Sequence, residues 1–132
     1  MYDLILCADV FEHVDDYYGF LRKLTNKTKY VIFNIPLDIH FLSLLRQKSI
    51  FKDTYEKVGH VHHFTKGTAL LALEHSGFKV IDSLHAKHRL HRKSLNTKGK
   101  MLYPFQKLLD LINEDLASAC FGGTSLVVLV KS

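Results

Sequence analysis

The chain has 132 residues, of which 47% are hydrophobic and 11% aromatic, a composition typical of a folded globular domain and not of a disordered segment. Its net charge of +5 is too small by itself to indicate a nucleic-acid-binding protein. No apolar run approaches the roughly 20 residues that span a bilayer, and two distant cysteines form neither a disulfide framework nor a thiolate metal site, so we expect a cytoplasmic protein.

The chain begins with an apolar run that ends in ionisable side chains. Residues 2–10 have the composition of a buried strand, and Asp9, Glu12 and His13 stand at or just beyond its end. In open α/β sheets, ligands bind beyond the carboxyl ends of parallel strands. These three side chains are therefore candidates for chemistry.

Helical and strand patterns alternate over the next part of the chain. Acidic residues open a helix over 14–26, and the β-branched run 30–35 predicts a parallel strand that Pro36 stops. Residues 39–45 are apolar on one face. Residues 47–57 are polar and lose this periodicity, so we expect a loop or lid there.

The central segment predicts a capped helix followed by a strand. Thr65 is the expected N-cap of a helix over 66–76, and Gly77 stands where a left-handed terminator belongs. Residues 78–84 alternate between apolar and polar side chains, which predicts a strand.

The last third predicts one long helix and a final strand. Residues 98–119 carry apolar side chains at helical spacing, and Pro104 limits where this helix can begin. The adjacent glycines at 122–123 then lead into an apolar strand over 124–130.

Three segments, in this order, resemble class I S-adenosylmethionine-dependent methyltransferases. The run YDLI followed by DVFEHV at 2–14 is similar to the motif after the family's fourth strand. Residues 59–80 are similar to a later segment of the family, through GH at 59–60, FT at 64–65 and GFKV at 77–80. The run GGTSLVVLVK at 122–131 resembles the family's last strand, which is antiparallel and lies between the fifth and sixth. The resemblance implies a Rossmann-like α/β sheet, mostly parallel with a final antiparallel strand, and S-adenosylmethionine as cofactor.

Two parts of the family pattern have no counterpart here. The glycine-rich cofactor loop should precede residue 2, and the acid that binds the cofactor's ribose is missing with it. The resemblance therefore implies that residues 1–132 form the C-terminal half of the domain. Such a chain is either part of a methyltransferase with an undetermined small-molecule or anionic acceptor, or an inactive remnant that acts as an interaction module. The open edge of the strand at 2–10 predicts self-association.

Glu12 and His13 are the candidate catalytic residues. A histidine can take the proton of an acceptor hydroxyl, and a neighbouring carboxylate can orient its ring or stabilise its cation. A purely structural role for both at the start of a helix has equal weight. By resemblance, four residues border the methionine moiety of the cofactor, with simple strand-end packing as the alternative. They are Cys7, Ala8, Asp9 and Val10.

The same residues permit a metal hypothesis. Asp9, Glu12 and His13 with a later histidine resemble the metal-binding arrangement of some small-RNA 2′-O-methyltransferases and ubiquinone-pathway O-methyltransferases. Those enzymes usually have glutamate where this chain has Asp9, so a divalent metal is not favoured. The preferred interpretation is a loop whose histidines bind no metal. These histidines are His60, His62 and His63.

Basic residues are concentrated between positions 84 and 100. A solvated segment is the favoured interpretation, and recognition of an anionic acceptor, a phosphate backbone or lipid headgroups is the alternative. No aromatic side chain lies in this segment to stack on bases, so nucleic acid is not favoured. The basic residues are His85, Lys87, His88, Arg89, His91, Arg92, Lys93, Lys98 and Lys100.

Overall fold

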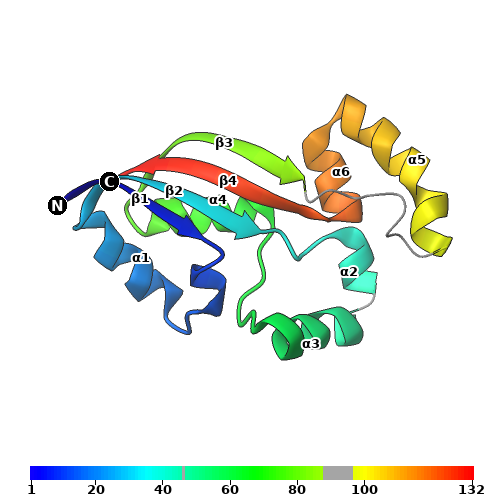
Figure 1. Cartoon of the computed structure of the whole chain (residues 1–132), viewed down its shortest axis with the longest axis horizontal. Coiled ribbons are helices and arrows are strands. Elements are labelled where there is room, and N and C mark those ends of the chain that lie inside the picture. The colour runs from blue at the N-terminus through cyan, green and yellow to red at the C-terminus, as the bar shows by residue number, and fades with distance from the viewer. Residues whose placement is uncertain (46, 88–96) are drawn as a thin grey trace.

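A computed structural model describes residues 1–45, 47–87 and 97–132 (Figure 1). Four strands form a single sheet. They are β1 (Tyr2–Ala8), β2 (Thr28–Pro36), β3 (Lys79–Lys87) and β4 (Thr124–Lys131). The helices are the short η1 (Phe11–His13), α1 (Tyr17–Thr25), α2 (Phe41–Leu45), α3 (Gln47–Val58), α4 (Lys66–His75), α5 (Thr97–Ile112) and α6 (Glu114–Phe121).

The strand order is β1-β2-β4-β3. β1 pairs with β2 in parallel, and β4 runs antiparallel to both of its neighbours, which confirms the expected insertion of the last strand. β1, β2 and β3 point in the same direction (Figure 1), but only one neighbouring pair is parallel. The expected mostly parallel sheet is therefore found only in part, because the inserted strand turns two of the three pairings antiparallel.

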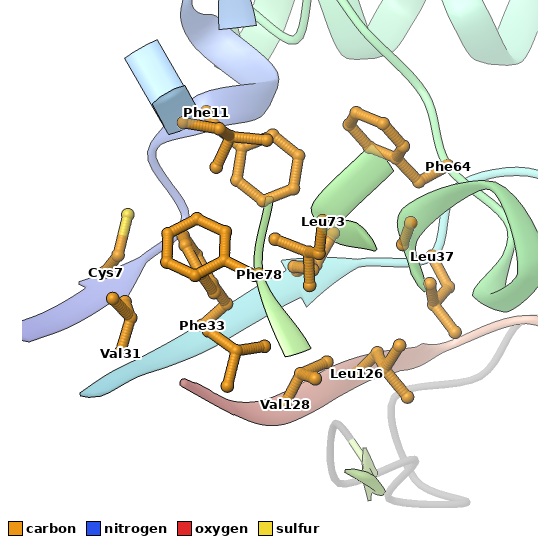
Figure 2. Close-up of a cluster of buried hydrophobic side chains, with 14 residues drawn as sticks. Cys7, Phe11, Val31, Phe33, Leu37, Phe64, Leu73, Phe78, Leu126 and Val128 are labelled. Carbon is orange, nitrogen blue, oxygen red and sulfur yellow. The ribbon is translucent and has the colours of Figure 1, made fainter. Parts of the chain in front are cut away.

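One face of the sheet carries the core, which α1 and α4 cover. Val31, Phe33 and Ile35 of β2 alternate inward and are fully buried, as are Leu21 of α1 and Leu73 of α4. Figure 2 shows Val31, Phe33 and Leu73 packed together with the aromatic rings of Phe11, Phe64 and Phe78 from the connecting segments. Alternation along a strand sends every second side chain to the same face, so the sequence pattern dictates this layer.

The opposite face of the sheet is uncovered over the described residues. Tyr2, Leu4 and Leu6 of β1 and Leu84 of β3 are all more than half exposed. The register places Leu6 beside Ile32 of β2, which is only partly buried. Large apolar side chains on a strand usually face another layer, so this face, here called the bare face, lacks the layer that its composition suits.

The predicted caps of α4 are confirmed, and Asn26 ends α1 as expected, but α1 begins at Tyr17 and not at residue 14. The Asp16 side chain accepts a hydrogen bond from the backbone N–H of Gly19, so α1 starts after the acidic residues and not among them. Thr65 and Thr68 form a capping box at the start of α4, and Gly77 follows its end with φ of +100°. A side chain at that φ would be strained, which explains the glycine.

The expected loop over 47–57 is wrong, because this segment forms α3. The helix is polar on most sides, so it shows little hydrophobic periodicity. Ion pairs one turn apart join Lys52 to Glu56 and Asp53 to Lys57, each at 3.6 Å, and such pairs stabilise a solvent-facing helix.

The single long helix expected over 98–119 is also wrong. Asn113 separates α5 from α6, and its side chain accepts a hydrogen bond from the N–H of Leu116 as the cap of α6. Pro104 does not limit the start of α5 but lies inside it. The proline is exposed, so water can satisfy the carbonyl group that lacks its usual donor. No described helix has both the length and the apolar composition needed to cross a bilayer.

Candidate functional site

Polar side chains meet beyond the carboxyl ends of β1 and β2. Asp9 follows β1 with φ of +50°, and its backbone N–H donates to the carbonyl of Asn34 over 3.0 Å. The Asn34 amide in turn donates to the Asp9 carboxylate over 3.1 Å. Asp9 is exposed, and its carboxylate is tied to the neighbouring strand.

The short helix η1 places Glu12 and His13 next to this edge. Glu12 is fully buried, and neither of its carboxyl oxygens has a hydrogen-bond partner within the described residues. Burial raises the pKa of Glu12, and the nearby Asp9 carboxylate adds to this effect, while His13 opposes it. A buried carboxyl without partners is costly, so it indicates a group held ready for a proton or a ligand.

The ring of His13 is held in one tautomer. Its Nδ1 lies 2.9 Å from the carbonyl oxygen of Gly59, which can only accept, so Nδ1 carries the proton. In the neutral ring Nε2 then has a free lone pair, and it lies 3.9 Å from Oε1 of Glu12. The side chain is partly exposed. This arrangement leaves Nε2 able to accept a proton or to bind a metal ion.

A histidine-rich loop at 59–63 packs onto η1. The backbone N–H groups of Val61 and His62 both donate to the carbonyl of Glu12, over 2.9 and 3.0 Å. The His60 ring meets the His13 ring edge-on, with centroids 4.8 Å apart. His62 turns away, because its Nε2 contacts the carbonyls of Val14 and Asp15 at the start of α1.

Asp38 completes the cluster, although sequence reasoning did not single it out. His60 Nδ1 and His63 Nδ1 lie 2.6 and 3.3 Å from the same oxygen of Asp38. Asp38 stands two residues beyond the end of β2, at the same edge of the sheet as Asp9. The rule that selected Asp9 from the end of the first strand would have selected Asp38 from the end of the second.

Among the described residues, two groups of three side chains have the spacing of metal ligands. Glu12, His13 and His60 form one, and Asp38, His60 and His63 form the other, with ligand atoms within 4.8 Å of one another in each. Carboxylate and imidazole together suit zinc and related divalent transition metals. Asp9 belongs to neither group, so only part of the set suggested by the sequence converges.

The candidate cofactor residues at the end of β1 differ in their access to solvent. Ala8, Asp9 and Val10 are exposed, so all three can border a ligand at this edge. The Cys7 side chain points into the core (Figure 2), and only its backbone could face a ligand. Burial, with help from Glu12, raises the pKa of the Cys7 thiol to about 11, so the thiol is neutral and unreactive near neutral pH.

Within the part of the basic segment that the structure describes, His85 and Lys87 form ion pairs. The Lys87 ammonium lies 2.9 Å from Asp110 and 2.8 Å from Glu114. His85 is buried against Asp115, with Nε2 at 2.6 Å from the carboxylate. The residues 88–93, which hold most of the basic side chains in this segment, lie outside the described residues.

Comparisons with known proteins identify the fold. No family model and no curated protein sequence matches the chain. Among solved structures, it is similar to a SAM-dependent methyltransferase from Archaeoglobus fulgidus, with 19% identity and a TM-score of 0.54. It is also similar to a proposed methyltransferase from Bacillus halodurans, with 15% identity and a TM-score of 0.58. The matches cover 99% of this chain but 60% and 66% of those two chains. The chain therefore has the Rossmann-like α/β fold found in these proteins.

Proposed function

We propose that this chain is the acceptor-side part of an S-adenosylmethionine-dependent methyltransferase, in which His13 removes the proton of the acceptor. The observation that carries the proposal is the position of His13 at the carboxyl edge of a methyltransferase-like sheet, with Nδ1–H donated to Gly59 and Nε2 free. That edge is where open α/β sheets bind their ligands.

The proposed reaction is an in-line displacement on the cofactor's sulfonium. A nucleophilic atom of the acceptor forms a bond to the methyl carbon as the carbon–sulfur bond breaks, and the sulfur keeps that electron pair. The acceptor proton passes to Nε2 of His13, and the buried Glu12 carboxyl group next to it, when ionised, stabilises the resulting cation. Ala8, Asp9 and Val10 would border the cofactor.

Cofactor binding in this proposal needs more than the described edge. No glycine-rich loop precedes β1 in the 132 residues, and the similar solved structures are longer than this chain. We therefore place that loop on a polypeptide segment outside these residues. The 132 residues alone should bind S-adenosylmethionine weakly in a calorimetric titration. A micromolar dissociation constant, about −8 kcal/mol, would contradict this placement.

The role of His13 has its own test. Long-range nitrogen–proton NMR spectra should show the Nδ1–H tautomer for the neutral ring, and the Nε2–H tautomer would contradict the proposal. In a form of the protein that binds the cofactor, His13→Gln should lower kcat by roughly 10² to 10⁴ with little change in KM for the cofactor. His62→Gln is the matched control, since that ring points away from the site.

A metal-assisted version of the same reaction is the second candidate. Neither carboxyl oxygen of Glu12 has a partner within the described residues, and one of them lies within 4.8 Å of a ligand atom of His13 and of His60, which favours this candidate. A divalent ion there would polarise an acceptor hydroxyl. Zinc should then raise the melting temperature of the wild type but not of His60→Ala, whereas His13 acting only as a base requires no such shift.

The third candidate is a catalytically inactive interaction module. The observation that favours it is the combination of an open β1 edge and the bare face, which can pair with another copy. This candidate would be supported over the first if the protein self-associates but shows no methyl-transfer activity under any condition.

A further inference from the structure

Asp38 joins two histidines of the 59–63 loop through one of its oxygens. His60 Nδ1 lies 2.6 Å and His63 Nδ1 lies 3.3 Å from Oδ2 of this carboxylate. The three side chains are between 12% and 21% exposed, so they are largely withdrawn from water and still reachable from it. Two imidazoles and one carboxylate are a ligand set of zinc sites with three protein ligands. Asp38, His60 and His63 are here called the Asp38 group.

The distances within the Asp38 group are close to those that a zinc ion requires. Zinc–ligand bonds of roughly 2.0 to 2.2 Å at tetrahedral angles place neighbouring ligand atoms about 3.4 Å apart. The 3.3 Å between His63 Nδ1 and the Asp38 oxygen is already near this value. His60 Nδ1 has to move away from the same oxygen by only about 0.8 Å, which a small rotation of the side chain provides.

The backbone holds the two parts of the Asp38 group together without help from their side chains. The N–H of Ile39, next to Asp38, donates to the carbonyl of Phe64, next to His63, over 3.2 Å. The Phe64 ring is buried in the core. The His63 ring packs against Phe51 of α3, with centroids 4.7 Å apart. The fold therefore brings the ligand atoms together before any ion binds, which lowers the entropic cost of binding.

We propose that Asp38, His60 and His63 bind a zinc ion that fastens the 59–63 loop to the end of β2. Each neutral ring binds the ion through Nδ1 and carries its proton on Nε2, and the Asp38 carboxylate supplies the negative charge. Three protein ligands leave the fourth position of a tetrahedral zinc open to water or to another ligand. The two nitrogen ligands favour zinc over magnesium and calcium, which prefer oxygen.

The Asp38 group is distinct from the group of Glu12, His13 and His60. His60 belongs to both, and a neutral ring offers one nitrogen lone pair, so the two groups compete for it. The Asp38 carboxylate is partly exposed and already contacts both of its rings, whereas the Glu12 carboxyl group is fully buried and lies 3.9 Å from His13. Zinc in the Asp38 group leaves Nε2 of His13 free, so this inference does not depend on the function proposed for that ring.

The test is calorimetric titration of the whole metal-free chain with zinc chloride, in which one ion should bind per chain. Asp38→Asn and His63→Ala should each weaken zinc binding by more than roughly 100-fold, because loss of a direct ligand exceeds the roughly 10- to 100-fold effect of a group that only hydrogen-bonds to a ligand. Cobalt(II) bound in place of zinc should give the intense visible absorption of a tetrahedral site. Magnesium should not displace the zinc.

Three control variants keep the test specific to the Asp38 group. His13→Ala and Glu12→Gln alter the other group only, and His62→Gln changes a histidine of the same loop that turns away from both. All three should bind zinc as the wild type does, and circular dichroism without zinc checks that every variant is folded. Binding that is lost in His13→Ala or Glu12→Gln but kept in His63→Ala would place the ion in the other group and overturn the proposal. Equal affinity in all variants, which indicates adventitious binding, or no zinc binding by the wild type would overturn it too.

Discussion

The two faces of the sheet are built from the same strands and differ in what lies against them. On the covered face, Phe33 packs edge-to-face against Phe11 and Phe78, with ring centroids 5.7 and 5.6 Å away. On the bare face, Leu6 of the neighbouring strand is mostly exposed. The comparison teaches that apolar composition on both faces of a strand predicts a layer on each, even where the described residues supply only one.

The largest difference in unfolding free energy is expected when a side chain on each face is truncated to alanine. Phe33→Ala should lower the free energy of unfolding by about 3 to 5 kcal/mol, because it leaves a cavity among buried rings. Leu6→Ala should change it by about 0.5 kcal/mol or less, since little apolar area is lost from the folded state. Urea unfolding of both variants measures the difference. A similar loss from Leu6→Ala would show that the bare face is covered.

The covered side also holds Glu12, and its charge predicts a pH effect. Because burial raises the pKa of Glu12 in the folded state above the ordinary 4.5, its protonated form is the one that folding prefers. Its stabilising contribution is complete below pH 4.5 and is lost as the pH rises through the raised pKa. Each unit of elevation costs about 1.4 kcal/mol.

Glu12→Gln should remove this pH dependence, since glutamine has the size of the acid but does not ionise. Unfolding free energies of the wild type and the variant, measured between pH 4 and pH 8, should diverge as the pH rises, with the wild type falling further. Parallel curves would mean that Glu12 has a partner when it is ionised.

The bare face and the open β1 edge are expected to affect the self-association of the protein more than its unfolding free energy. The wild type should form dimers or larger species at micromolar concentration, because unpaired backbone groups lie beside apolar side chains. Leu4→Lys with Leu6→Lys should give a monomer in light scattering while changing the unfolding free energy by roughly 0.5 kcal/mol or less. Leu71→Lys on α4 is the control and should leave the association unchanged. A wild-type monomer whose amides at residues 4–6 resist hydrogen exchange would contradict the open edge.

A small effect on stability is also expected at the rim of the sheet, where α6 meets α4 and β3. Lys66 and His85 lower the pKa of the Asp115 carboxyl group. That carboxylate is exposed, so Asp115→Asn should cost only about 0.2 to 1 kcal/mol. Because the pKa of Asp115 is lowered in the folded state, its carboxylate stabilises the fold at pH values above the ordinary pKa of 3.8. This stabilisation is lost as the pH falls through the lowered pKa. The melting temperatures of the variant and the wild type should therefore differ less at pH 2 than at pH 7.

Sequence patterns predicted the elements whose causes are local. Three strands follow from apolar or β-branched runs, the strand at 78–84 follows from alternation, and α4 follows from Thr65 and Gly77 at its two ends. α3 was missed because ion pairs between its turns, and not an apolar face, accompany its polar sequence. The break at Asn113 was missed because the apolar periodicity continues across it, and only the capping geometry distinguishes it.

The candidate site divides in the same way. Glu12 and His13 are adjacent in the sequence and could be selected from the strand that precedes them. Their relation to His60 depends on how the loop at 59–63 packs, which no local pattern specifies. Only the metal hypothesis, which was not favoured, placed Asp9 in the same cluster, and its carboxylate accepts from Asn34 of the next strand instead.

The hydrogen bonds between η1 and the 59–63 loop have a consequence for the order of folding. Gly59 and His13 are 46 positions apart in the chain, whereas only η1 and α1 lie between β1 and β2. Closing a segment of that length costs on the order of 3 kcal/mol of chain entropy, plus a constant, before any contact is made. The His13 ring therefore gains its fixed orientation only after this closure, and local opening of the 59–63 loop releases the ring while the sheet stays intact.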